Sequence, residues 1–338
     1  MRKSVLFGTM AIAGLAAGAA AATTLEDVKA RGALNCGVNT GLVGFAAPDA
    51  DGVWGGFDVA LCRAVAAAVL GDSTAVEFVS LTGKTRFTSL AAGEIDMLSR
   101  NTTWTFSRDN DLKFEFVGIN YYDGQGFMVP RALGVSSATE LDGATVCIQT
   151  GTTTELNLAD FFRANNMSYD PVPIETNAEA QQQYLAGACD VYTTDASGLA
   201  ATRANFEAPG DHVVLPEIVS KEPLGPLVRH GDNEWGDIVR WTLNALISAE
   251  EVGITSANIG ELSAGTNNPE INRILGTEGD LGAMIGLDAE WAKRAIMVGG
   301  NYGEIFESNI GEATPIGLSR GLNAQWKDGG LLYSPPFR

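Results

Sequence analysis

Three short stretches of this 338-residue chain combine residue types that can hold opposite charges. The first contains Arg100, Asn101 and Thr103 and leads on to Arg108, so that guanidinium, amide and hydroxyl groups are concentrated together. A guanidinium can bind a carboxylate through two parallel hydrogen bonds, which Lys cannot reproduce. The alternatives are that Arg108 forms a surface salt bridge and that the Asn-Thr-Thr stretch is a polar turn or a helix cap.

The second stretch is Gly151, Thr152 and Thr153, between an apolar run and a helical segment. A glycine turn at the start of a helix presents free backbone N–H groups and the positive end of the helix dipole, which favours a carboxylate or a phosphate. The glycine spacing fits neither a dinucleotide fingerprint nor a Walker A loop, so no nucleotide is implied. The alternative is simple capping by Thr152, which with Glu155 makes a capping box.

The third stretch ends at Asp195, where a predicted strand meets the next predicted helix. Asp at such a junction is commonly an N-cap. The functional alternative is a counter-ion for a bound ammonium group. A guanidinium, a helix N-terminus and a carboxylate together meet the needs of a buried amino-acid zwitterion, because either charge left unpaired in a closed cleft would cost several kcal/mol.

Apolar runs of strand length alternate with segments of helical spacing. Residues 57–70 carry apolar side chains at 57, 61, 65 and 69, which is helical spacing, and Gly71 predicts the end of that helix. We expect strands over 33–38, 75–81, 95–98, 114–122, 126–129, 145–150, 170–174, 191–194, 213–215 and 224–229. We expect helices over 57–70, 85–92, 153–165, 178–186, 196–206, 235–251, 269–275 and 288–299, followed by a glycine-rich tail.

This alternation predicts an α/β fold with mainly parallel sheets, in which ligands bind beyond the carboxyl ends of the strands. Residues 147–211 read as a compact α/β unit flanked by two returning strands, which predicts one lobe inserted into another. We expect a discontinuous first lobe over 23–122 and 226–338, with a helical C-terminal extension, and a second lobe over 123–225. Two hinge strands near 122–124 and 223–225 would join them, and the lobes would close on the ligand.

The composition excludes several classes of partner and of metal site. The formal charge of −19 argues against nucleic acid and anionic membrane surfaces as partners. Two His residues exclude a His-rich metal centre, and no cofactor is expected. Residues 1–22 have a positive start, an apolar run over 5–19 and small residues around Ala22, which predicts a signal peptide; a membrane anchor is the alternative. Cleavage would remove Arg2 and Lys3 and leave a mature charge of −21.

Export gives the four cysteines an oxidising environment. Four cysteines allow three pairings, and we expect Cys36 to pair with Cys62 and Cys147 with Cys189, one bridge in each lobe. The first pair joins a predicted strand to the helix that follows it, and the second pair adjoins apolar runs in the middle of the chain. The C-x-x-C spacing of a metal site is absent. The alternative is two buried pairs of free thiols.

Several motifs, in their order along the chain, resemble those of a known protein family. They are 56–61 (GFDVAL), 92–96 (AGEID), 103–108 (TWTFSR), 121–122 (YY), 149–153 (QTGTT), 186–190 (AGACD) leading to Asp195, 301–304 (NYGE) and 321–323 (GLN). The chain resembles the periplasmic amino-acid-binding proteins of ABC importers, family 3 of the solute-binding proteins, in their general L-amino-acid-binding branch. The resemblance covers nearly all of the mature chain and implies the two-lobed periplasmic-binding-protein fold.

The resemblance also implies roles for individual residues. Arg108 and the N–H groups of Thr103 and Thr153 would bind the α-carboxylate of an amino acid. Asp195, the carbonyl of Asn101 and the hydroxyl of Thr103 would bind its α-ammonium group. Family members selective for basic side chains have an acidic residue and an aromatic in their first loop. The matching positions here are Asn39 and Leu42, with Gly44 in place of an expected proline.

We therefore expect a periplasmic, monomeric binding protein for free L-amino acids that delivers them to the permease subunits of an ABC transporter. An open, polar side-chain pocket would give broad specificity, with Arg100 favouring Glu, Gln, Asp or Asn. The rival interpretation is an exported enzyme on the same fold, dehydratase-like and acting on a small carboxylate. Such an enzyme would need a positioned acid or base, for which Glu155 or Asp195 are the candidates.

Overall fold

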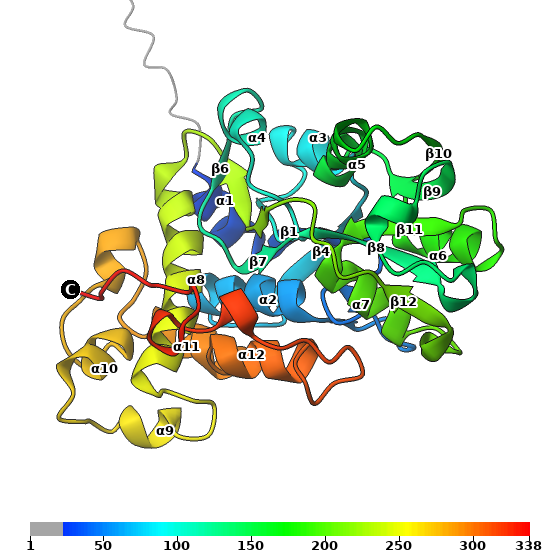
Figure 1. The fold of residues 1–338 in the computed structure, drawn as a ribbon. Coiled ribbons are helices and arrows are strands. Elements are labelled where there is room, and N and C mark those ends of the chain that lie inside the picture. Colours follow the sequence, from blue (N-terminus) through cyan, green and yellow to red (C-terminus); the bar gives the residue numbers. More distant parts are fainter. Residues whose placement is uncertain (1–22) are drawn as a thin grey trace, which may run out of the picture.

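Two five-stranded sheets organise the protein, and the computed structural model describes residues 23–338 (Figure 1). The strand order is β4-β1-β5-β14-β6 in the first sheet and β10-β9-β11-β8-β12 in the second. In each sheet the first three strands pair in parallel and the last two pair antiparallel. The sheets are thus mixed, because the strands that return after a crossover run the opposite way. The predicted signal peptide lies outside the described residues.

The secondary structure elements have the following bounds. The strands are β1 (Leu34–Asn39), β2 (Ala47–Pro48), β3 (Trp54–Gly55), β4 (Val76–Leu81), β5 (Met97–Leu98), β6 (Phe114–Phe116), β7 (Tyr121–Asp123), β8 (Gln125–Pro130), β9 (Ala144–Gln149), β10 (Tyr169–Ile174), β11 (Val191–Asp195), β12 (His212–Val214), β13 (Glu222–Leu224) and β14 (Leu227–Arg229). The helices are α1 (Thr24–Arg31), α2 (Phe57–Leu70), α3 (Arg86–Ala91), α4 (Phe106–Asn110), α5 (Thr153–Ala164), α6 (Asn177–Leu185), α7 (Ala196–Ala204), α8 (Asn233–Val252), α9 (Ile259–Leu262), α10 (Pro269–Ile274), α11 (Trp291–Gly299) and α12 (Tyr302–Asn309).

Most predicted elements are present, and the differences have local causes. Four helices were not predicted: α1, α4, α9 and α12. Helix α12 lies in the tail interpreted as glycine-rich, and it begins at a capping box in which the Asn301 and Glu304 side chains each accept from the other residue's backbone N–H. The extended runs predicted over 114–122 and 224–229 are each divided between two strands, because part of each run leaves the first sheet and pairs elsewhere.

The two sheets are joined by a short antiparallel ladder. Strand β7 pairs with β13, with Tyr122 opposite Pro223 and Asp123 opposite Glu222. The chain runs through β7 from the first sheet to the second and returns through β13. This two-stranded ladder lies where the sequence predicts the hinge.

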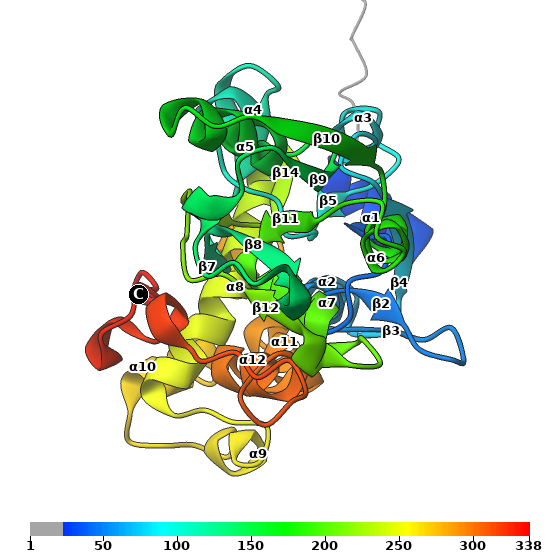
Figure 2. The same ribbon diagram turned by 45° about the vertical axis from the view of Figure 1, so that its right-hand side comes forward.

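Large apolar clusters cover both sheets. The largest joins β1 to helices α2, α8, α11 and α12, which pack on one another beside the first sheet (Figures 1 and 2). A smaller cluster covers that sheet's other face, and two further clusters lie on the second sheet. The C-terminal elements α9 to α12 therefore extend the lobe built on the first sheet, which is the helical extension that the sequence predicts.

Both predicted disulfides are present. Cys36 of β1 binds Cys62 of α2, and Cys147 of β9 binds Cys189 just before β11. Each bridge therefore joins neighbouring elements within one sheet and its covering helices. Among residues 23–338 no free cysteine remains.

Candidate ligand-binding site

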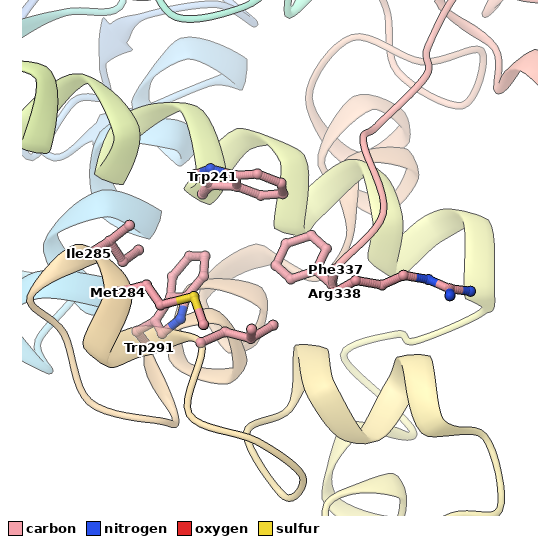
Figure 3. Close-up of a pocket in the computed structure, with 7 residues that line it drawn as sticks. Trp241, Met284, Ile285, Trp291, Phe337 and Arg338 are labelled. Carbon is pink, nitrogen blue, oxygen red and sulfur yellow. The ribbon is translucent and has the colours of Figure 1, made fainter.

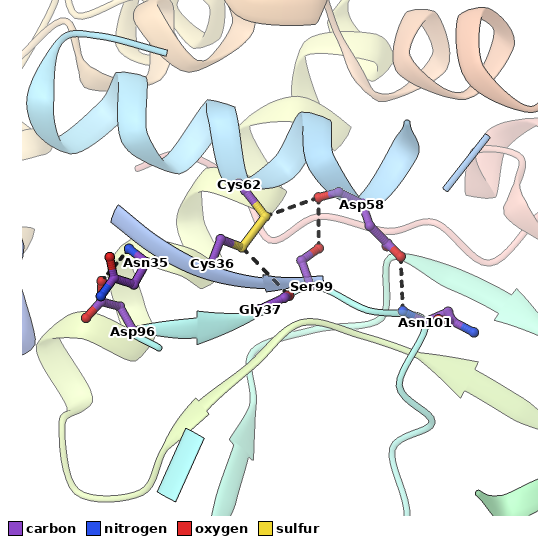
Figure 4. Close-up of a disulfide and its surroundings, with 8 residues drawn as sticks. All are labelled: Asn35, Cys36, Gly37, Asp58, Cys62, Asp96, Ser99 and Asn101. Atoms are coloured by element: carbon purple, nitrogen blue, oxygen red, sulfur yellow. Dashed lines mark hydrogen bonds between the residues drawn. A yellow bond between two sulfur atoms is a disulfide. The ribbon is translucent and has the colours of Figure 1, made fainter. Parts of the chain in front are cut away.

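The loop after β5 is held by the first turn of α2 (Figure 4). The N–H of Asn101 donates to Asp58 Oδ2 at 3.0 Å, and Ser99 Oγ donates to the Asp58 carbonyl at 3.0 Å. One turn further along α2, Cys62 forms its disulfide with Cys36. Asn101 has a φ of 28°, a region that residues other than glycine seldom adopt. The contacts to α2 thus fix an unusual backbone at a predicted ligand contact.

The N-terminus of α5 faces this loop. Thr152 Oγ1 accepts from the N–H of Glu155 at 3.3 Å, so Thr152 is an N-cap. The Glu155 carboxylate accepts from the N–H of Gly151 at 3.0 Å rather than from Thr152, so the predicted capping box forms only in part. Gly151 has a φ of 74° and lies against the Gly83 backbone, which a side chain there would crowd. This turn therefore lies in contact with the first lobe at the start of α5.

Asp195 ends β11 and immediately precedes α7, but its side chain makes no capping hydrogen bond. The N–H groups of α7 are bound by other groups, since Ala196 donates to the carbonyl of Gly124 at 2.8 Å and Ser197 to Asp123 at 3.4 Å. The Asp195 carboxylate is buried and accepts from Asn101 Nδ2 at 3.4 Å. Burial, with the negative charges of Asp123 and Glu222, holds its pKa well above the usual range. A bound cation would stabilise the ionised form of Asp195 and lower this pKa.

The two lobes touch along the site. Thr103 Oγ1 lies 3.2 Å from Thr153 Oγ1, and Asn177 Nδ2 donates to Asn39 Oδ1 at 3.0 Å. At the rim, Lys84 Nζ lies 2.8 Å from Glu175 Oε1. With the bond between Asn101 and Asp195, these contacts join the first sheet's loops to the second sheet's helices, so the structure is a closed form.

A small polar cavity of about 20 Å³ remains between the lobes. It is lined by Arg86, Arg100, Asn101, Thr103, Gln149, Thr152, Thr153, Thr154, Thr194 and Asp195. The sequence predicts six of these as ligand contacts: Arg100, Asn101, Thr103, Thr152, Thr153 and Asp195. Gly151 and Arg108 were also predicted and do not line the cavity itself.

Arg108 lies immediately behind the cavity wall. Its Nη1 donates to the carbonyl of Thr103 at 2.8 Å, and its guanidinium stacks over Phe87 at 5.1 Å from the ring centre. The side chain is buried, and among the described residues no carboxylate lies within salt-bridge distance of it. A surface salt bridge therefore does not explain Arg108. Burial lowers its pKa to about 10, against the negative charges of Glu222 and Asp195, so it remains a cation at neutral pH.

Two further buried arginines line the cavity. Arg86, which was not predicted, donates to Thr102 Oγ1 at 3.1 Å and to the Gly151 carbonyl at 3.4 Å, while Arg100 donates to the Leu81 carbonyl at 2.9 Å. Within residues 23–338, Arg86 Nε and Arg100 Nη2 are buried without a hydrogen-bond partner. Burial and the charges of the other arginines lower the pKa of Arg86, and burial lowers that of Arg100 to about 10. Both residues, which line the cavity, therefore have an unpartnered hydrogen-bond donor.

The sequence matches the model of the bacterial extracellular solute-binding proteins, family 3, over residues 34–256. This chain belongs to that family. It is 68% identical over 100% of both chains to the glutamate/glutamine/aspartate/asparagine-binding protein BztA of Rhodobacter capsulatus. It is 56% identical, again over 100% of both, to the general L-amino acid-binding periplasmic protein AapJ of Rhizobium johnstonii.

A solved structure of this family has the same architecture. The periplasmic binding protein of an ABC transporter from Brucella ovis, with glutathione bound, is 57% identical and superposes with a TM-score of 0.91 over 94% of this chain and 100% of that chain. The two-lobed fold expected from the sequence is thereby confirmed. The curated relatives are named as binding proteins, which supports a solute-binding protein over an enzyme.

An apolar cavity has no lining residue in common with the polar one (Figure 3). It lies between α8, α11 and the C-terminal residues, and Phe337 packs there between Trp241 and Trp291. It has none of the paired polar groups that would orient a zwitterion, so the polar cavity remains the candidate site of this family member. Among the described residues no helix has the length and apolar character to cross a membrane, and no group of three or more His, Cys, Asp or Glu could hold a metal ion.

Proposed function

We propose that this protein is the periplasmic substrate-binding component of an amino-acid ABC importer and that it binds the zwitterion of L-amino acids between its lobes. The observation that carries the proposal is the buried carboxylate of Asp195, which lines the interlobe cavity without capping a helix. Buried arginines line the same small space. A ligand with both signs of charge satisfies such a site, because a charge buried without a partner is costly.

The α-ammonium group binds to Asp195, with the backbone carbonyl of Asn101 and the hydroxyl of Thr103. In support, Asn101 donates its side-chain amide to Asp195, and Asn101, Thr103 and Asp195 all line the cavity. An ammonium has only donors, and all three groups can accept. Its positive charge also offsets the repulsion that raises the pKa of Asp195.

The α-carboxylate binds to Arg108 and to the N–H groups of Thr103 and Thr153. The turn at Gly151 and Thr152 presents those of α5, where the helix dipole favours an anion. Arg108 holds the Thr103 carbonyl through Nη1 in the closed form, which leaves further N–H groups for the ligand.

The side chain of the ligand meets Arg86 and Arg100. Their unpartnered nitrogens favour a carboxylate or an amide oxygen, so Glu, Gln, Asp and Asn are the preferred ligands. The name of the Rhodobacter relative contains the same four amino acids. The Rhizobium relative is named for general L-amino acids. A polar cavity that binds mainly the α-ammonium and α-carboxylate groups of the ligand is compatible with such broad specificity.

Glutathione is a second candidate ligand, because a 57% identical protein is described with glutathione bound. The γ-glutamyl end of glutathione carries a free α-ammonium and α-carboxylate, so the same contacts suit it. A tripeptide needs more room between the lobes than a free amino acid does, so free amino acids are the first candidates.

The two lobes close on the ligand when it binds. We propose that residues 23–122 with 226–338 move as one lobe and residues 123–225 as the other, about the ladder of β7 and β13. The contacts assigned to the ligand come from both sides of the cleft, so the ligand stabilises the closed form, in which all of them act together.

The expected partners follow from this function. The closed form docks on the permease subunits of an ABC transporter, in the periplasm, as a monomer. Residues 1–22 serve as the signal peptide, and the formal charge of −19 argues against nucleic acid as a partner. Relatives named as periplasmic and as amino-acid-binding support this assignment.

A thermal-shift screen against the twenty amino acids, sugars and phosphate tests the proposal, because a ligand that binds only the folded state raises its melting temperature. We expect the largest shifts with Glu, Gln, Asp and Asn, followed by calorimetry of the best ligand. The variant Arg108→Ala should lose that binding. Shifts with sugars or phosphate and none with any amino acid would overturn the function, and near-wild-type affinity in Arg108→Ala would refute the role of Arg108.

A further inference from the structure

Glu222, at the start of β13, carries four hydrogen bonds on a carboxylate that is only 1% exposed. Its Oε2 accepts from Thr103 Oγ1 at 2.5 Å and from Thr153 Oγ1 at 2.8 Å. Its Oε1 accepts from Asn157 Nδ2 and from Ser220 Oγ, both at 2.6 Å. Hydrogen bonds to an ionised carboxylate are roughly twice as strong as neutral ones, so this is a strong junction. It joins the hinge to both walls of the cleft.

One of these donors is fixed to the hinge strand. The loop around Thr103 runs beside β13, where Trp104 N–H donates to the Pro223 carbonyl at 2.8 Å and Gly225 N–H donates to the Thr102 carbonyl at 3.0 Å. Thr103 itself is bridged to Leu224 in this pairing. The bond between Thr103 and Glu222 therefore persists when the lobes move.

Two other donors lie on α5 in the body of the second lobe, whereas Glu222 lies in the hinge strand β13, which is bound to the Thr103 loop. Thr153 and Asn157 are one helical turn apart on α5, which packs against β9 and β11 of the second sheet. Their side chains reach Glu222 only when α5 lies against the hinge and the first lobe. These two bonds are therefore made on closure, together with the contact between Thr153 and Thr103.

The carboxylate also sets the direction of the Thr103 hydroxyl. A hydroxyl has one hydrogen and two lone pairs, and an ionised carboxylate can only accept. The hydrogen of Thr103 Oγ1 therefore points to Glu222, and its lone pairs are left for other groups. The hydroxyl becomes an acceptor on the cavity wall, which is what an ammonium group requires.

We propose that Glu222 is a positioning residue for ligand binding. It orients the Thr103 hydroxyl as an acceptor, and it holds the start of α5 in the closed form through Thr153 and Asn157. This inference rests on the proposed function, in which Thr103 and the N-terminus of α5 bind the amino acid. Glu222 does not touch the ligand, because it lies behind both threonines and does not line the cavity.

Exchanging the groups of Glu222 and Asn157 provides the test. Glu222→Gln has one oxygen and one NH₂ where the carboxylate has two oxygens, so it cannot accept from both pairs of donors: it loses the acceptor either of Thr103 and Thr153 or of Asn157 and Ser220. In Asn157→Asp two carboxylates face each other. The double variant Glu222→Gln with Asn157→Asp restores a donor facing an acceptor. We expect each single variant to bind its best amino acid about tenfold more weakly, or worse, mainly through faster dissociation, and the double variant to recover most of the loss.

The measurements are calorimetry for Kd, stopped-flow tryptophan fluorescence for the dissociation rate, and small-angle scattering for ligand-induced closure. Circular dichroism of the ligand-free proteins checks folding, and Glu207→Gln, an exposed Glu on the second lobe, is the matched control with unchanged affinity. Single variants within about twofold of the wild type, or a double variant no better than the weaker single, would overturn the role of Glu222. Wild-type protein that binds no amino acid would instead overturn the proposed function, and this inference with it.

Discussion

The side chain of Asn323 pairs with the backbone of Tyr122 as a neighbouring strand would. Asn323 Oδ1 accepts from the Tyr122 N–H at 2.7 Å, and Asn323 Nδ2 donates to the Tyr122 carbonyl at 3.1 Å. Tyr122 lies opposite Pro223 in the ladder, and Pro223 has no N–H to offer. The C-terminal extension thus satisfies the outer edge of the hinge strand β7.

The variant Asn323→Ala should therefore destabilise the protein. It leaves two backbone groups of a buried site without their partner, which costs roughly 1–3 kcal/mol for an unsatisfied group. Urea unfolding followed by circular dichroism measures the loss. Leu322→Ala is the control, since the neighbouring Leu322 is exposed; equal effects in both variants would show that the bonds to Tyr122 contribute nothing.

Arg86 should determine which side chains bind. Arg86→Met keeps much of the apolar stem and removes the charge, so we expect Glu and Asp to lose at least about tenfold in affinity and small neutral amino acids to change little. Calorimetry with Glu and with Ala as ligands gives the ratio. Arg131→Met, a change of an exposed arginine outside the cavity, is the control. A uniform loss for all ligands would mean that Arg86 serves only the cavity's shape.

Much of the fold could be predicted from the sequence because local patterns determine it. Helix α2 begins and ends at the predicted residues, since apolar side chains recur at helical spacing and Gly71 takes the left-handed conformation at its end. The strand ends that carry Asn101, Thr153 and Asp195 could be located in the same way. Parallel strands then bring these ends to the same edges of their sheets.

The rest depends on contacts between distant segments. Arg86 opens a helix and has no local feature that distinguishes it from a solvated arginine; its burial comes from Thr102 and the Gly151 carbonyl. Glu222 likewise follows a short polar stretch, and its partners Thr103 and Asn157 lie far away in the sequence. The roles of Arg86 and Glu222 can therefore be identified only in the folded structure, where these distant segments meet.

The second disulfide should contribute strongly to stability. Cys147 and Cys189 are 42 residues apart, and closing a loop of that length stabilises the fold by about 4 kcal/mol in the chain-entropy model. The double variant Cys147→Ala with Cys189→Ala should lose about that much in urea unfolding. The single variant Cys189→Ala, which leaves one thiol, should lose a similar amount. Unchanged unfolding in reducing buffer would contradict a structural role for the bridge.

Two buried carboxyl groups predict an unusual dependence of stability on pH. Burial raises the pKa of Asp58 to about 6, against hydrogen bonds from Asn101 and Asn120 and the charge of Arg100. Burial likewise raises that of Asp123 to about 6. Unfolding returns both to their usual value of 3.8. Between about pH 4 and 6 the folded protein therefore holds more protons than the unfolded chain, and its stability falls as pH rises.

The ligand-free protein should consequently be more stable at pH 5 than at pH 7, by about 1 kcal/mol for each of these carboxyls. In Asp58→Asn the group no longer titrates, so part of this difference disappears while the bond from the Asn101 N–H can be kept. Urea unfolding at pH 5, 6 and 7 measures both slopes, with Asp51→Asn, an exposed change, as the control. Parallel pH profiles for the wild type and Asp58→Asn would show that Asp58 stays ionised across this range, and its burial would then need another source of compensation.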